Sequence, residues 1–357
     1  MNPMLLTVHP RTLILGSMNE SHLLDTPFLG ALIARMKNLR TVSITYCDVE
    51  GWPYVNVFAT PSKLQITSLE IRRVQMTFRE FMTLLSSPCL THLRLSALTI
   101  GDYPSSEGEL GIDFTSPDCR FPQPQSALQR PIQDFRLDVI TTSDIVIMDL
   151  IATSRHPIIA EGSMINVSFS SEWSLDEHVS RFQRFLDCKA VKSAQKLHLG
   201  SPDEYFFTEE DSSEYDPLIF DRFKTVELRS VIPRHWDEYE TEFQWWANSL
   251  SAVRVGSALK KLRLIVTFIS SEMSDLPDVA LPVWPNLDAA LCGRNLALDR
   301  LVIDVFSMGR LTEWKKPIIK NWFFTCLPKT YKKYFTKETK NASLRVHDSL
   351  EDDDDDD

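Results

Sequence analysis

The sequence lacks the short motifs that mark most enzymes and metalloproteins. Its six cysteines lie 30 to 104 residues apart and form no CxxC pair, a spacing typical of reduced, mostly buried thiols. Its eleven glycines form neither GxGxxG nor the GxxxxGK phosphate loop. Its eight histidines are dispersed without an HExxH, and no serine lies in a GxSxG elbow. We therefore predict no catalytic residue, no metal site and no cofactor.

A broad excess of positive charge is also absent. The net charge is −11, but residues 351–357 supply seven of the negative charges, which leaves −4 for the other 350 residues. A nearly neutral body lacks the positive field with which proteins attract polyanions. We therefore expect no nucleic-acid partner.

No long apolar run interrupts the chain. Polar and charged residues break every apolar stretch in the first 30 residues, so neither a signal peptide nor a membrane span is predicted there. Together with the unpaired cysteines, this favours an intracellular protein, cytoplasmic or nuclear.

A repeated unit of about thirty residues is present instead. Each copy has an apolar residue, two residues of any kind, a second apolar residue, one of any kind, and a third apolar residue. Chance would produce such a short pattern on the order of ten times in this composition, so the even spacing matters more than any single match. The central positions are residues 13, 42, 69, 93, 135, 165, 197, 226, 262 and 301.

Amphipathic segments precede several of these short strands. Their apolar residues step by three and four, which predicts helices near residues 28–36, 78–85, 175–186, 243–250 and 287–291. Helix, turn and short strand then form one unit. Stacked units would place parallel strands in one layer and helices in another, because neither layer buries its apolar side alone.

At this point the chain resembles the leucine-rich-repeat family. Residues 39–49, LRTVSITYCDV, match the pattern LxxLxLxxCxL, with Cys47 at the position that the family fills with Asn or Cys. Residues 259–269 carry Thr267 there, and other copies carry Val74, Leu98 or Val231, which cannot donate a side-chain hydrogen bond. The irregular repeats are most similar to those of fungal F-box and leucine-rich-repeat proteins.

The resemblance implies an α/β solenoid of nine or ten irregular repeats, with parallel strands on the concave face and helices on the convex face. We expect the solenoid to occupy residues 1–310, with a proline- and glycine-rich inserted loop at 101–131. We expect a C-terminal capping helix within residues 311–340, around Trp314, Ile318 and Trp322, and a disordered acidic tail at 341–357.

The resemblance also implies protein recognition without catalysis, in the manner of a substrate receptor of a cullin-type ubiquitin ligase. No F-box segment with a Leu-Pro start precedes the repeats. The alternative is an enzyme or nucleic-acid-binding protein with a doubly wound α/β sheet. Such proteins carry long apolar strands and glycine-rich strand-to-helix turns, whereas these strands are short and alternate.

A binding strip follows from the alternation of side chains along each strand. Residues between the apolar positions should point away from the core, where they can contact a partner. The candidates for partner contact are Arg94, Arg136, His198, Glu227 and Arg263. Their mixed charge suits a protein partner better than a polyanion. A basic, aromatic segment at 310–340 is better explained as a soluble end cap than as a binding site.

Overall fold

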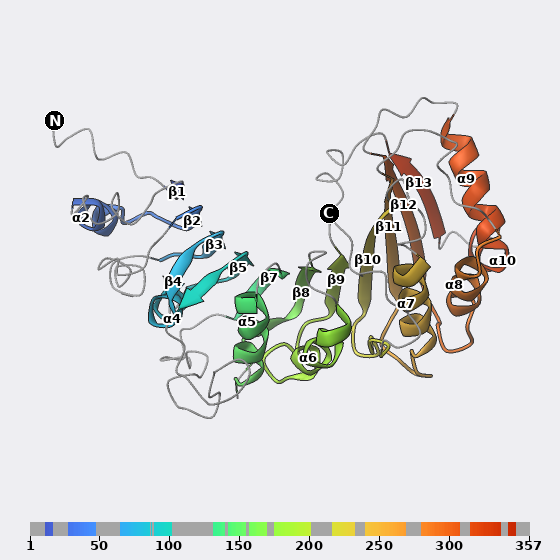
Figure 1. Cartoon of the computed structure of the whole chain (residues 1–357), viewed down its shortest axis with the longest axis horizontal. Helices are drawn as coiled ribbons and strands as arrows, with labels where there is room; N and C mark the ends of the chain where they lie inside the picture. Colours follow the sequence, from blue (N-terminus) through green and yellow to red (C-terminus); the bar gives the residue numbers. More distant parts are fainter. Residues whose placement is uncertain are drawn as a thin grey trace. The chain divides into compact units, whose positions relative to one another are not determined.

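The structure is a computed structural model of the 357-residue chain (Figure 1). It describes residues 11–16, 28–47, 65–85, 87, 89–101, 131–139, 142–154, 157–169, 175–200, 216–232, 240–268, 280–307, 315–336 and 342–347. The predicted loop at 101–131 lies almost wholly outside these residues, as does the segment 203–216, which is rich in acidic side chains. The chain forms two compact units, Met1–Asn166 with Arg184–Ala194, and Val167–Gln183 with Gln195–Asp357, called unit 1 and unit 2 below.

Unit 1 contains strands, helices and one short additional ladder. Its elements are β1 (Thr12–Gly16), α2 (Phe28–Arg35), β2 (Thr41–Thr45), β3 (Ser68–Arg72), β4 (Gln75–Thr77), α4 (Phe78–Leu85), β5 (His92–Ser96), β6 (Thr99–Gly101), β7 (Ile132–Val139), α5 (Thr142–Ala152) and most of β8 (Ile159–Phe169). Helix α6 (Leu175–Asp187) contributes residues to both units.

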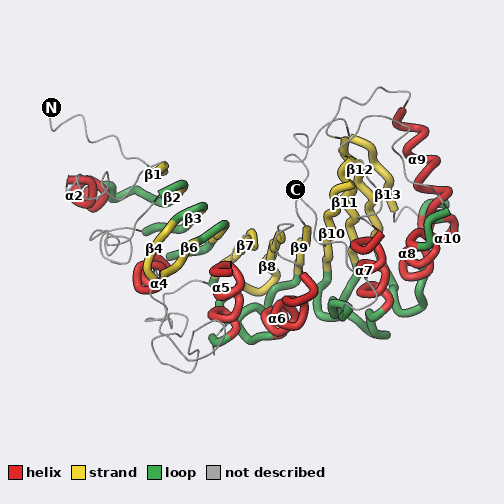
Figure 2. Tube along the Cα trace, in the orientation of Figure 1, coloured by secondary structure: helices red, strands yellow, loops and turns green. Residues whose placement is uncertain are grey.

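Unit 2 alternates helices and strands, as Figure 2 shows. Its elements are β9 (Lys196–Gly200), β10 (Thr225–Ile232), α7 (Glu240–Ser251), β11 (Lys261–Phe268), α8 (Val283–Leu291), β12 (Arg300–Ser307), α9 (Lys315–Cys326), α10 (Pro328–Tyr334) and β13 (Ala342–His347). Helices α7 to α10 lie on one side of strands β10 to β13 (Figure 1).

One large sheet holds eleven strands in the order β1-β2-β3-β5-β7-β8-β9-β10-β11-β12-β13, and β4 pairs with β6 separately. The strand order follows the chain order without a reversal. The registered pairs are parallel, from β1 with β2 to β12 with β13. The prediction of an α/β fold with a parallel sheet is therefore confirmed. Each of the ten predicted strand positions lies in a strand of this sheet.

The repeated apolar positions stand in register across neighbouring strands. In unit 1, Val42 pairs with Leu69, Leu69 with Leu93, and Leu93 with Phe135. In unit 2 the corresponding row is Leu197, Val226, Leu262 and Leu301. All of these side chains are buried. Period-two alternation thus fixes which face of each strand enters the core, because a slip of one residue would expose the whole row.

A left-handed residue follows three successive strands of unit 1. Tyr46, Arg73 and Ala97 have φ of 55°, 50° and 51°. This conformation turns the chain sharply after each strand. The next residues in each copy are buried or begin the second ladder, in which Gln75 pairs with Thr99.

The residue after each turn shows how the repeats differ. Cys47 donates its Sγ hydrogen to the carbonyl of Leu15, 3.6 Å away, and approaches that of Thr45 at 3.2 Å. In the copy at Leu98 the hydrogen-bond partner of the backbone comes from a helix: the Leu98 N–H donates to Asp144 of α5 at 3.2 Å. Thr267, the corresponding residue of β11, is buried without a hydrogen-bond partner for its hydroxyl among the described residues.

The predicted helices are present as α2, α4, α6, α7 and α8. Helix α4 begins with a reciprocal capping box, in which the Thr77 N–H donates to Glu80 at 2.8 Å and the Glu80 N–H donates to the Thr77 hydroxyl at 3.3 Å. Its Phe78, Phe81 and Leu85 are buried. Helix α5 was not predicted. Its residues Ile145 to Ile151 are mostly apolar on every side, so no helical period marks them.

The C-terminal end differs from the expectation in two ways. Two helices, α9 and α10, replace the single predicted cap, and Asp288 of α8 accepts the backbone N–H groups of Lys329 and Thr330 at 3.0 and 2.7 Å. The prediction of a disordered tail from residue 341 is wrong for residues 342–347, which form β13. Alternation at Ala342, Leu344 and Val346 lets this strand pair with β12.

Candidate functional site

The five residues predicted to contact a partner lie on two separate parts of the chain. Arg94 (β5) and Arg136 (β7) face each other in the register of unit 1. His198 (β9), Glu227 (β10) and Arg263 (β11) form one row in unit 2. Each alternates with buried apolar neighbours on its strand, so the two groups occupy the polar side of the sheet in their units.

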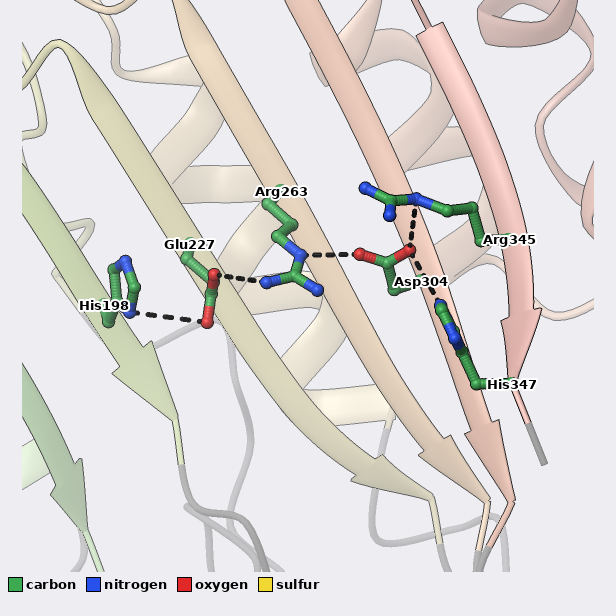
Figure 3. A network of polar contacts seen from close by, with 6 residues as sticks. All are labelled: His198, Glu227, Arg263, Asp304, Arg345 and His347. Atoms are coloured by element: carbon green, nitrogen blue, oxygen red, sulfur yellow. Dashed lines mark hydrogen bonds and ion pairs between the residues drawn. The ribbon is translucent and has the colours of Figure 1, made fainter. Parts of the chain in front are cut away.

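The row in unit 2 is part of a continuous network of polar contacts (Figure 3). His198 Nδ1 lies 3.5 Å from Glu227 Oε1, and Arg263 donates from Nη1 to Glu227 Oε2 at 3.2 Å. Arg263 also donates from Nε to Asp304 Oδ2 at 2.5 Å. The two acids thereby hold the Arg263 guanidinium from both sides.

Asp304 is the centre of this network, although the sequence did not single it out. Its side chain is fully buried at 0% exposure. Its second oxygen, Oδ1, lies 3.2 Å from Arg345 Nε and 3.3 Å from His347 Nε2, both on β13. The His347 ring stacks on Phe306 at 4.5 Å. A buried carboxylate requires such compensation, because an unpaired charge in the interior costs several kcal/mol.

His198 ends the network at its outer edge. Burial lowers the pKa of His198, and the nearby Glu227 carboxylate opposes this shift, while Arg263, Arg229 and Lys196 add to it. The lowered pKa favours the neutral form of His198 at neutral pH, so its 3.5 Å contact with Glu227 is weaker than a full ion pair.

The corresponding surface of unit 1 is more open. It consists of three rows of side chains on β2, β3, β5 and β7, and we call it the unit 1 face. The rows are Thr41, Ser68, His92 and Asp134; Ser43, Glu70, Arg94 and Arg136; and Thr45, Arg72, Ser96 and Asp138. All twelve are polar or charged.

Ion pairs on the unit 1 face are long. Arg94 lies 3.7 Å from both Glu70 and Asp138, Arg72 lies 3.7 Å from Glu70, and Arg136 lies 3.5 Å from Asp134. Among the described residues, none accepts a hydrogen bond from these three guanidinium groups, and Arg94 Nε is buried without such an acceptor. Arg263 in unit 2 donates two hydrogen bonds, so the two groups of arginines are held differently.

Charges of opposite sign also lie at different depths on this face. The side chains of Arg72, Arg94 and Arg136 are 37–45% exposed, whereas those of Glu70, Asp134 and Asp138 are 22–29% exposed. Glu70 is further held by the Ser43 hydroxyl, which donates to it at 2.9 Å. The arginine side chains of this face are therefore more exposed to an approaching molecule than its carboxylate side chains.

Two other side chains that alternation places on the polar side of the sheet, His92 and Val302, differ in exposure. His92 is exposed at the end of this face, and its Nδ1 lies 3.0 Å from the Thr91 hydroxyl. Val302, which alternation placed on the polar side of β12, is 6% exposed. It is therefore not available for contact, because the polar side of unit 2 becomes buried toward β12.

Neither a metal site nor a membrane-spanning helix is present in the described part of the chain. No group of three or more His, Cys, Asp or Glu side chains there is arranged to hold a metal ion. No described helix has both the length and the apolar composition needed to cross a bilayer.

Comparison with known proteins gives no relative from which a function could be transferred: no family model matches this sequence, and no curated protein is significantly similar to it.

Proposed function

We propose that this chain is a non-catalytic protein-binding scaffold with a leucine-rich-repeat-like solenoid architecture, and that it contacts its partner through the unit 1 face. The observation that carries the proposal is the array of polar and charged side chains on four adjacent strands, with half-exposed arginines on three of them. Proteins recognise partners through such surfaces when rigid backbone elements hold the side chains at fixed spacing.

The solenoid part of the proposal is supported by strand order and register. The strands follow the chain order, whereas a doubly wound sheet reverses its order at the point where it binds ligands. The repeated apolar positions align, and the Cys47 thiol donates to a carbonyl of the preceding strand. A leucine-rich repeat uses its Asn or Cys position in the same way.

The partner-binding part is supported by the difference between the two polar groups. In unit 2, Arg263 is already paired with both Glu227 and Asp304. A partner that contacted Arg263 or Glu227 would therefore have to break these interactions. In unit 1, half-exposed guanidinium groups retain unused donors. Arg94 and Arg136 are therefore better candidates for partner contact than His198, Glu227 and Arg263.

A charge-reversal experiment tests this function. The tagged full chain would be purified from its native cells with its associated proteins, which mass spectrometry identifies. Arg94→Glu/Arg136→Glu should lose the associated proteins. Arg79→Glu/Lys189→Glu, with the same change in charge at exposed positions of unit 1, should retain them.

Retention of every associated protein by Arg94→Glu/Arg136→Glu would contradict the proposal, provided that its circular dichroism matches that of the wild type. Recovery of a cullin and its adaptor among the lost proteins would extend the proposal to a substrate receptor of a ubiquitin ligase.

A further inference from the structure

We infer that the unit 1 face binds an acidic peptide segment of its partner, in which separated carboxylates meet the guanidinium groups of Arg72, Arg94 and Arg136. This inference rests on the proposed function and specifies the chemistry of the partner.

Donor capacity is the first argument. Each guanidinium carries five N–H groups in a planar fork that matches a carboxylate. The ion pairs of Arg72 and Arg94 at 3.7 Å are too long for hydrogen bonds. Arg136 is 3.5 Å from Asp134, at the outer limit. A ligand carboxylate could accept two short bonds from such a group without displacing an existing one.

The depth of the charges is the second argument. An approaching molecule has more access to the three half-exposed arginine side chains than to Glu70, Asp134 and Asp138, which are less exposed. The more exposed charges of the face are therefore cationic. This order favours carboxylates over ammonium or guanidinium groups on the partner.

The charge balance argues against a continuous polyanion. The three arginines and the three recessed acids of the face carry no net charge together. A nucleic acid gains its affinity from a field that acts on many phosphates, and this face offers no such field. Individual carboxylates instead gain short-range, charge-assisted bonds wherever they meet a guanidinium.

Spacing sets the pattern of the peptide. Arg94 and Arg136 are direct partners on adjacent strands, about 4.8 Å apart at their Cα atoms. Arg72 lies on the neighbouring strand β3 and pairs with Ser96, two residues beyond Arg94 on β5. The Cα atoms of Arg72 and Arg94 are therefore about 8 Å apart along the diagonal. Alternate side chains of an extended peptide are about 7 Å apart. Two acids separated by one neutral residue therefore match the distance between Arg72 and Arg94.

The test uses the purified full chain and a fluorescein-labelled decapeptide of alternating Ser and Glu in fluorescence anisotropy titrations. The wild type should bind it, and Arg94→Gln/Arg136→Gln should weaken binding at least about tenfold, because two sets of charge-assisted hydrogen bonds are lost. Arg79→Gln/Lys189→Gln should bind as the wild type does. A decapeptide of alternating Ser and Gln should not bind.

A second variant separates the positive charge of the two arginines from the planar geometry of their guanidinium groups, and its conservative substitutions are less disruptive to folding. Arg94→Lys/Arg136→Lys keeps the positive charges but loses the planar fork, so its affinity should fall between those of the wild type and the Gln variant. Equal binding of the Ser-Glu peptide by wild type, Gln and Lys variants would overturn the inference, as would tighter binding of a thymidine oligonucleotide.

Failure of the inference can be distinguished from failure of the proposed function. If the Ser-Glu peptide does not bind but Arg94→Glu/Arg136→Glu still loses the associated proteins, the face binds a partner of other chemistry and the inference is wrong. If the peptide binds at these arginines but the associated proteins are retained, the inferred chemistry stands and the proposed use of the face is wrong.

Discussion

At the scale of single residues, the environment of each arginine decides its role. Arg94 and Arg263 occupy equivalent positions between the apolar residues of their strands. Arg263 meets the buried Asp304 and is fixed by hydrogen bonds, whereas Arg94 lies between two distant carboxylates. The same residue type is thus a structural element in unit 2 and an available donor in unit 1.

Glu242 shows how burial alone can govern one residue. It lies on α7, fully buried, and accepts a hydrogen bond from Trp246 Nε1 at 3.2 Å. Burial raises the pKa of Glu242 from 4.5 to about 8, against the smaller opposing effect of the hydrogen bond from Trp246. The folded protein therefore keeps this proton at neutral pH, whereas the unfolded chain releases it.

A pH-dependent stability follows for Glu242→Gln. Between pH 4.5 and about 8 the unfolded state binds fewer protons at this site than the folded state. The unfolding free energy of the wild type therefore falls by up to about 1.4 kcal/mol for each unit by which the pH rises. Glutamine removes this loss. The unfolding free energy of the variant relative to the wild type should therefore increase from pH 5 to pH 8 in urea titrations followed by tryptophan fluorescence.

Glu161→Gln is the matched control, because Glu161 is exposed on β8. Its unfolding free energy should keep the pH dependence of the wild type. Parallel pH profiles for wild type and Glu242→Gln would show that Glu242 is ionised in the folded protein, contrary to this account.

At the scale of elements, the turns after β2, β3 and β5 store backbone strain. Tyr46, Arg73 and Ala97 adopt positive φ without being glycine. The left-handed conformation costs a residue with a Cβ roughly 1–2 kcal/mol. The repeat keeps the turn because the next residue, such as Cys47, Val74 or Leu98, is buried beneath it.

Replacing one of these residues by glycine should relieve the strain. Ala97→Gly removes only one methyl group and should raise the unfolding free energy by about 0.5–1 kcal/mol. Ala289→Gly, at an exposed position within α8, should lower it by a similar amount, because helical glycine loses more backbone entropy. Urea midpoints measure both. Destabilisation by Ala97→Gly would show that the turn is not strained.

At the scale of the whole molecule, the buried rows of apolar residues hold each unit together. Leu93 and Leu262 are 2% and 1% exposed, and they lie in the central rows of units 1 and 2. A carboxylate at either position would be buried among apolar neighbours without a partner. The rows connect successive repeats, so the damage should extend beyond one strand.

Leu93→Asp and Leu262→Asp should each therefore lower the unfolding free energy by about 4 kcal/mol or more. Circular dichroism during thermal unfolding measures the loss. Ile14→Asp and Val255→Asp place the same charge at side chains that are 70% and 83% exposed, and each should cost less than about 0.5 kcal/mol. Unchanged melting of both leucine variants would remove the repeat assignment.

The repeats and their layers were largely determined by the sequence itself. The spacing of the apolar positions predicted ten of the strands, one in each repeat, and steps of three and four residues predicted five of the helices. Local periodicity fixes which side of an element is buried. The same rule predicted that Arg94, Arg136, His198, Glu227 and Arg263 would lie on the polar side.

Only the tertiary structure decided what those side chains contact. Arg263 and Asp304 are 41 residues apart in the sequence. The local pattern of β11 or of β12 does not indicate that the buried Asp304 carboxylate accepts a hydrogen bond from Arg263. Helix α5 and strand β13 were missed for a related reason. An evenly apolar helix has no period, and β13 acquires its partner only when β12 lies beside it. Periodicity is local, whereas ion pairing and depth depend on which distant strands become neighbours.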